Sequence, residues 1–169
     1  ARRARIEAAL KRGVADPAIT ARLIALLETA PKSELEHADR AWALDRIAEL
    51  RVTTPEIRQA LEKAAPWAEG ESLRALFDAA RAHRLNSRAI RNKAANLLER
   101  ARTAGDIPSG EYQAFRAAVE YYITIAPLRG RLAFRNTVMR LMDENHGPEL
   151  KAAGLDESSI RSIRNTVRV

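Results

Sequence analysis

The sequence predicts an all-α protein: a single domain, residues 1–169, built as an array of about nine short antiparallel helices. Alanine and other strong helix formers fill long stretches, interrupted by only seven glycines and seven prolines. Runs of β-branched and aromatic residues that would favour strands are scarce. Apolar residues recur at helical spacing between these interruptions. A composition of 46% hydrophobic and 30% charged residues is that of a globular chain able to bury a core.

The first three helices are delimited by glycine, proline and capping residues. The first covers residues 2–12 and stops at Gly13. The second begins with Pro17 in its first turn, after Asp16 as an acidic cap. The third covers residues 33–51. Short connections between them predict antiparallel neighbours.

The third predicted helix carries apolar residues on two sides. The broader face contains Ala43, Leu44, Ile47, Ala48 and Leu50, and the other contains Leu35, Ala38 and Trp42. A helix with two apolar faces is typical of a middle layer between neighbours. The alternative is that Trp42 only covers the edge of the core.

The fourth helix has the clearest start signal in the chain. Thr53 and Glu56 are spaced as a capping box, and Val52 and Ile57 as a hydrophobic staple. The same five-residue apolar spacing recurs at Val14–Ile19, Leu85–Ile90, Ile107–Tyr112 and Leu155–Ile160. These predicted helix starts are unevenly spaced along the chain, which argues against a strict solenoid. Two arrangements remain: an irregular helical-hairpin repeat, HEAT- or TPR-like in general shape, or an orthogonal bundle.

Five more helices complete the prediction. They are expected at 69–84, at 87–103, after Pro108, from Pro127 to His146, and at 158–167. In the helix after Pro108, Tyr112, Phe115, Val119 and Tyr122 share one stripe and are expected in the core. Tyr121 lies at the edge of this stripe. It is either a candidate for stacking on a base or a partner, or an ordinary amphipathic boundary residue.

The net charge of +7 is unevenly distributed. Residues 1–80 contain equal numbers of basic and acidic side chains, so the whole excess lies in residues 81–169 and predicts a positive field at one end. The first basic cluster consists of Arg81, Arg84, Arg88, Arg91 and Lys93. Such a row could follow phosphates, because guanidinium groups bind them with two hydrogen bonds. The alternative is a solvated face with intrahelical pairs such as Arg102 with Glu99.

A second basic cluster lies within an otherwise apolar face. Arg131 and Arg135 fall four residues apart on the side that also carries Leu132 and Met139. An arginine in such a place needs a carboxylate, carbonyl groups or a partner molecule. Both a structural ion pair and a ligand or partner site therefore remain open.

Several classes of site are excluded or left without support. The absence of cysteine excludes disulfides, thiolate metal sites and a cysteine nucleophile, and fits any compartment. No apolar run approaches the roughly 20 residues of a membrane helix, and no signal peptide precedes the first amphipathic pattern. His37, His83 and His146 are isolated, and glycine-rich phosphate loops and nucleophile elbows are missing. We therefore expect no metal or cofactor and nominate no catalytic residue.

Three hypotheses of function follow. The leading one is a non-catalytic helical scaffold that binds another macromolecule, with a protein partner favoured. The alternative is nucleic-acid binding through the phosphate backbone by the basic second half, although few exposed aromatics argue against single strands. The third, an accessory domain of an enzyme, has no residue to support it.

Overall fold

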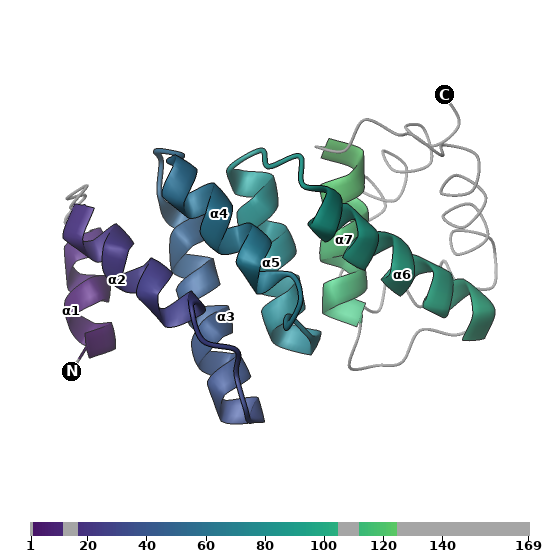
Figure 1. Cartoon of the computed structure of the whole chain (residues 1–169), viewed down its shortest axis with the longest axis horizontal. Coiled ribbons are helices and arrows are strands. Elements are labelled where there is room, and N and C mark those ends of the chain that lie inside the picture. The colour runs from purple at the N-terminus through teal and green to yellow at the C-terminus, as the bar shows by residue number, and fades with distance from the viewer. Residues whose placement is uncertain (1, 12–16, 105–111, 125–169) are drawn as a thin grey trace.

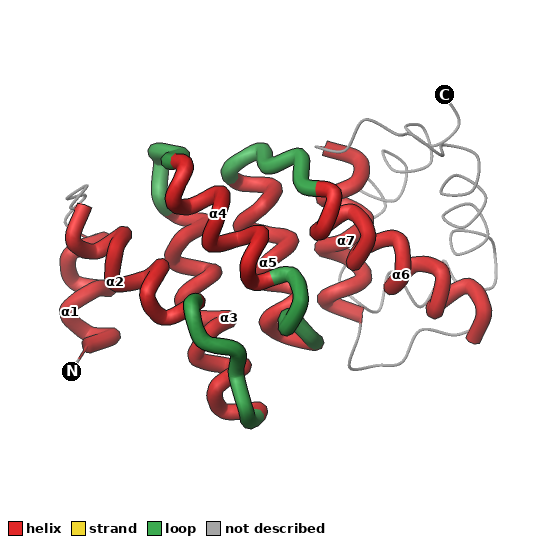
Figure 2. The backbone as a smooth tube through the Cα atoms, in the orientation of Figure 1, coloured by secondary structure: helices red, strands yellow, loops and turns green. Residues whose placement is uncertain are grey.

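The computed structural model describes residues 2–11, 17–104 and 112–124, and within these ranges all regular secondary structure is helical. Figures 1 and 2 show the helices, with the connections between them in Figure 2. They are α1 (Arg2–Lys11), α2 (Pro17–Leu27), α3 (Glu34–Glu49), α4 (Pro55–Ala64), α5 (Gly70–Ala82), α6 (Arg88–Ala104) and α7 (Tyr112–Thr124). The described part of the chain is therefore all-α, as predicted. The two helices predicted after Pro127 lie outside the described residues.

Contacts between the helices are of two kinds. Helices two apart in the sequence pack together in three cases, α3 against α5, α5 against α7 and α2 against α4. Successive helices pack together in the pairs α2–α3, α4–α5 and α6–α7. Because successive helices run in opposite directions, the α2–α3 and α4–α5 connections share one edge, and the α3–α4 and α5–α6 connections share the opposite edge (Figures 1 and 2).

α5 is the most enclosed helix of the described chain. It contacts α3, α4 and α7, and Ala75, Ala79 and Ala80 are fully buried together with Leu76 and Phe77. The small alanine side chains let neighbouring helices approach closely, while the two large side chains supply most of the apolar area removed from water. α5 therefore fixes the positions of the two connections that flank it, α4–α5 and α5–α6.

The start of α4 differs from the sequence prediction. Thr54, not Thr53, is the N-cap, and its hydroxyl accepts a hydrogen bond from the Ile57 amide at 3.2 Å. Pro55 occupies the first helical turn, where its missing N–H costs nothing, so the residue just before it becomes the cap. Val52 is 63% exposed and does not act as the predicted staple.

α3 contacts other helices on two sides, but the predicted second apolar face is covered only in part, because Ala38 is exposed and Trp42 is partly buried. One side meets α5, and on the other Trp42 donates a hydrogen bond from Nε1 to Glu7 of α1 at 3.0 Å. The guanidinium carbons of Arg3 and Arg46 lie 5.0 and 5.8 Å from the centre of the Trp42 ring, within range of cation–π attraction. Leu35 was wrongly placed in this second face, because it is 74% exposed.

A charged network joins α3 to α5. The Arg74 guanidinium donates to both carboxylate oxygens of Asp45, at 3.1 and 2.9 Å, and to Asp78 and Glu71, each at 2.7 Å. Burial by itself lowers the pKa of Arg74, but the hydrogen bonds to Asp45 and Glu71 outweigh it and raise this pKa above its usual range. Burial raises the pKa of Asp78, and the hydrogen bond from Arg74 only partly offsets this.

Arg74→Met is expected to lower the free energy of unfolding by about 2 kcal/mol, because it leaves the half-buried Asp45 carboxylate without a counter-ion among the described residues and leaves Asp78 with the more distant Arg81 guanidinium at 4.0 Å. Urea unfolding followed by circular dichroism measures this change. As a control, Arg58→Met removes an exposed arginine from α4 and should change stability by less than about 0.5 kcal/mol. Equal effects of the two variants would contradict a structural role for Arg74.

The raised pKa of Asp78 predicts a pH dependence. The folded state binds the Asp78 proton more tightly than the unfolded chain, so this group stabilises the fold at low pH and loses that contribution as pH rises. The wild-type protein should therefore gain stability relative to Asp78→Asn as pH is lowered from about 7 to about 4. Urea unfolding of both proteins at each pH tests this, and a difference that stays constant or reverses would refute the sign.

Candidate functional site

The turn between α5 and α6 has an unusual backbone conformation. The Leu85 amide donates to the Ala80 carbonyl at 2.8 Å and the Arg84 amide donates to the Arg81 carbonyl at 3.1 Å, the pattern of a Schellman motif. Arg84 occupies the left-handed position of this motif, with φ 49°. Glycine is the usual residue there, because a Cβ atom crowds the backbone in this conformation. Among the described residues Arg84 is the one non-glycine with positive φ.

His83, the residue before Arg84, is held in place by two hydrogen bonds. It is 3% exposed, with Nε2 at 2.7 Å from the Ile47 carbonyl of α3 and Nδ1 at 2.8 Å from the Thr53 hydroxyl. A carbonyl oxygen can only accept, so Nε2 must carry a proton, and in the neutral ring Nδ1 accepts the hydroxyl proton. The end of α5 is thereby tied to α3 and to the α3–α4 connection.

Tyr121, for which the sequence left open either stacking on a base or partner or an ordinary boundary position, is not exposed for stacking. Its side chain is fully buried. Its hydroxyl donates to the Leu85 carbonyl at 3.0 Å, and the Ser87 amide lies 3.4 Å from the Tyr121 hydroxyl oxygen. The ring centre lies 5.9 Å from that of Phe77. Because α7 packs against both α5 and α6, a residue at the edge of its apolar stripe becomes enclosed. Tyr121 therefore holds the α5–α6 turn in place.

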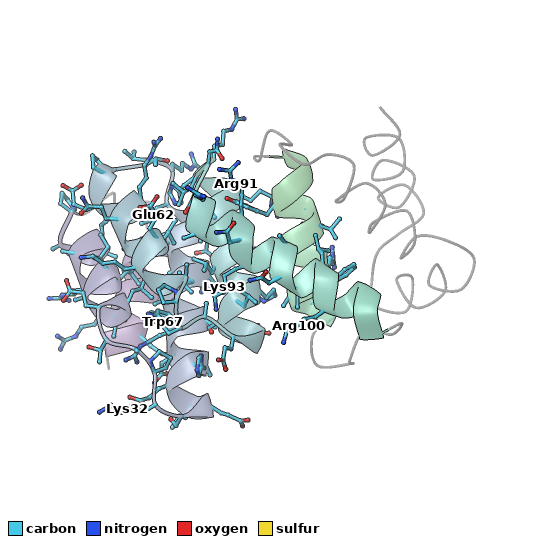
Figure 3. The ribbon with its side chains drawn as sticks, turned by 45° about the vertical axis from the view of Figure 1, so that its right-hand side comes forward. Lys32, Glu62, Trp67, Arg91, Lys93 and Arg100 are labelled. Atoms are coloured by element: carbon cyan, nitrogen blue, oxygen red, sulfur yellow. The ribbon has the colours of Figure 1, made fainter. Side chains whose placement is uncertain are left out.

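The first basic cluster does not form one continuous row. Arg81 is paired with Glu120 of α7 at 2.9 Å, and Arg91 is half-buried. Lys93 donates to the Ala68 carbonyl at 3.2 Å, and Figure 3 shows Arg91 and Lys93 on opposite sides of α6. Arg84 and Arg88 remain exposed.

The second cluster, Arg131 and Arg135, lies outside the described residues. Its two predicted roles are therefore not tested.

Arg51 joins Arg84 and Arg88 on one edge of the molecule. It is exposed on the α3–α4 connection, which the bond between Thr53 and His83 holds beside the α5–α6 turn. None of the three has a carboxylate within 4.0 Å among the described residues. We call Arg51, Arg84 and Arg88 the basic edge. Arg51 was not predicted from the sequence, because nothing in the sequence shows which connections share an edge.

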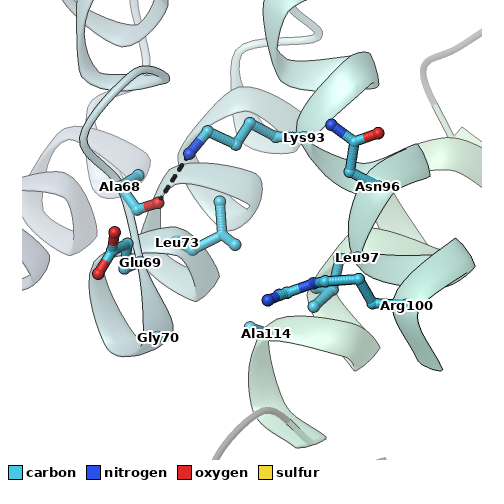
Figure 4. Close-up of a pocket in the computed structure, with 9 residues that line it drawn as sticks. All are labelled: Ala68, Glu69, Gly70, Leu73, Lys93, Asn96, Leu97, Arg100 and Ala114. Carbon is cyan, nitrogen blue, oxygen red and sulfur yellow. Dashed lines mark hydrogen bonds between the residues drawn. The ribbon is translucent and has the colours of Figure 1, made fainter. Parts of the chain in front are cut away.

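A pocket of about 520 Å³ lies at the other end of α5, between α5, α6 and α7 (Figure 4). Its apolar wall consists of Leu73, Leu97 and Ala114, all buried. Lys93 and Arg100 of α6 also line it. The pocket thus combines a small apolar surface with basic groups.

Ser72 and His37 lie next to this end of α5 but are not arranged as a nucleophile and base. The Ser72 hydroxyl donates to the Glu69 carbonyl at 2.8 Å and accepts from the Glu69 amide at 3.0 Å. His37 Nδ1 lies 2.9 Å from the Ser72 hydroxyl oxygen. It therefore donates to this oxygen, because the hydroxyl proton is already used in the bond to the Glu69 carbonyl. Ser72 is fully buried and serves to cap α5.

No group of three histidine, aspartate or glutamate side chains among the described residues is close enough to hold a metal ion. Among the same residues no helix combines the length and the apolar character needed to cross a membrane. Comparison of the chain with protein-family models, with curated proteins and with solved structures found no match.

Tyr121→Phe is expected to lower the free energy of unfolding by about 1–3 kcal/mol, because the buried Leu85 carbonyl loses its hydrogen-bond donor. Urea unfolding measures the change. Thr29→Val, which removes an exposed hydroxyl, is the control and should change stability by less than about 0.5 kcal/mol. A Tyr121→Phe protein as stable as the wild type would contradict the assigned role.

Proposed function

We propose that the chain is a non-catalytic helical scaffold that binds an acidic partner protein at its basic edge. The observation that carries the proposal is Arg84, an exposed arginine without an ion pair among the described residues, at a left-handed position that favours glycine. Arginine there costs about 1 kcal/mol relative to glycine. A residue kept at the expense of stability suggests a role for its side chain.

The backbone around Arg84 supports a binding role. His83 and Leu85, on either side of it, are both buried, and the Schellman hydrogen bonds fix the turn between them. The arginine is thus presented from a rigid backbone, which reduces the entropy lost when a partner binds. Its planar guanidinium can donate two parallel hydrogen bonds to one carboxylate.

The distribution of charge favours a protein partner over nucleic acid. Phosphate-backbone binding depends on many cations placed along the strand, and single strands also need exposed aromatic rings. Here Arg81 is already neutralised by Glu120, Lys93 is directed to the Ala68 carbonyl at the other end of α5, and Tyr121 is buried. A few guanidinium groups at a rigid turn fit surface carboxylates of a protein better than a continuous track of phosphates.

We propose further that the helices form an irregular helical-hairpin array rather than an orthogonal bundle. The supporting observation is that three pairs of helices two apart in the sequence pack together: α3 on α5, α5 on α7 and α2 on α4. In such an array the connections gather along two edges, and side chains from separate hairpins can form one binding surface.

The test is capture of partners by the whole chain and by two variants of equal charge. Arg51, Arg84 and Arg88 are changed together to glutamine in the first variant. The matched control changes Arg5, Arg22 and Lys63, three exposed cations on other parts of the surface, to glutamine. A stoichiometric partner protein should be retained by the wild type and the control and lost by the basic-edge variant. Equal capture by all three would refute the proposed surface, and capture of nucleic acid alone, falling steeply with salt, would support nucleic-acid binding instead.

Arg84→Gly separates stability from binding. Glycine relieves the left-handed backbone, so the free energy of unfolding should rise by about 0.5–1 kcal/mol, while retention of the captured partner falls. Urea unfolding and the same capture assay measure the two effects. A glycine variant that is less stable than the wild type, or that retains the partner fully, would contradict the proposed trade of stability for binding.

A further inference from the structure

The strongest unassigned feature is the charge of Lys93 inside the pocket between α5, α6 and α7. Lys93 is half-buried as a residue, and no carboxylate lies within 4.0 Å of its ammonium among the described residues. The one hydrogen bond recorded for it goes to the neutral Ala68 carbonyl at 3.2 Å. An ammonium has three donors, and a partly desolvated cation without a counter-ion is unfavourable. Lys93 therefore has both the capacity and the electrostatic reason to bind an anion.

The walls of the pocket indicate what kind of anion fits. Leu73, Leu97 and Ala114 are buried and form an apolar surface next to the ammonium. The exposed Asn96 and the guanidinium of Arg100 lie on the α6 side (Figure 4). A volume of about 520 Å³ is within the range of small-molecule sites, which combine apolar walls with a few polar groups.

We infer that this pocket binds a small organic acid, with its carboxylate on the Lys93 ammonium and its apolar body against Leu73 and Leu97. A carboxylate matches the ammonium in charge and accepts short, charge-assisted hydrogen bonds. A branched aliphatic body matches the apolar wall, which a fully polar anion would leave in contact with water. The Glu69 carboxylate also lines the pocket, so the formal charges of Lys93, Arg100 and Glu69 sum to +1, which suits a singly charged anion better than one of higher charge.

The pocket and the basic edge are separate sites. α5 has 13 residues and is about 20 Å long, with the pocket at its first turn and Arg84 just beyond its last. Loss of one site therefore does not imply loss of the other. The inference does not depend on the proposed protein partner.

The test titrates the whole chain with isovalerate and, as a neutral match, with isovaleramide. Amide signals in two-dimensional NMR spectra are followed. Isovalerate should shift the signals of residues 68–73 and 93–100 saturably, and isovaleramide should bind at least about tenfold more weakly, because it lacks the charge. Absence of a saturable shift, or equal binding of acid and amide, would overturn the inference without the use of any variant.

Lys93→Met tests the residue itself, because methionine keeps the length of the side chain and removes its charge. Affinity for isovalerate should fall about tenfold, while the unfolding equilibrium constant should change less than about fivefold, since loss of the hydrogen bond to the Ala68 carbonyl opposes the removal of a half-buried charge without a counter-ion. Lys63→Met on α4 removes an exposed lysine and should bind as the wild type does. A less stable Lys93→Met protein with wild-type affinity would assign Lys93 to holding α6 against Ala68 and would overturn the inference.

Discussion

The enclosure of α5 between α3, α4 and α7 is the constraint on which the rest of the described structure depends. Its alanine-rich surface allows close approach on several sides, and Arg74 adds a charged link to Asp45 of α3. Burial of apolar area supplies most of the stability. The charged link adds less, because burying Arg74 and Asp78 offsets part of its attraction. Its main effect is to fix how α5 lies along α3.

Both candidate sites are consequences of this enclosure, since they occupy the two ends of α5. At the end of the helix, Arg84 has the left-handed conformation between the buried residues His83 and Leu85. At its start, Ala68, Glu69 and Gly70 form one side of the pocket that Lys93 enters from α6. A rigid central helix thus carries a charged turn at one end and a basic pocket at the other.

Local signals in the sequence predicted the helices well, whereas the candidate sites depend on which helices meet. Ser33 caps α3 and Pro17 begins α2, because capping and proline geometry act within one turn. The ion pair of Arg81 could not be predicted in this way, since its partner Glu120 lies on α7. The same holds for Tyr121, which is enclosed only because α7 contacts two helices. Burial of Ser72 and its bond to His37 likewise join distant segments.

Amide hydrogen exchange at Leu85 tests the rigidity of the α5–α6 turn most directly. This amide donates to the Ala80 carbonyl and closes the turn that presents Arg84. If the turn is part of the core, the Leu85 amide should be protected as strongly as those of Leu76 and Phe77 and exchange only with global unfolding. Rapid exchange at Leu85 beside slow exchange in α5 would show that the turn opens independently, and Arg84 would then not be held in place.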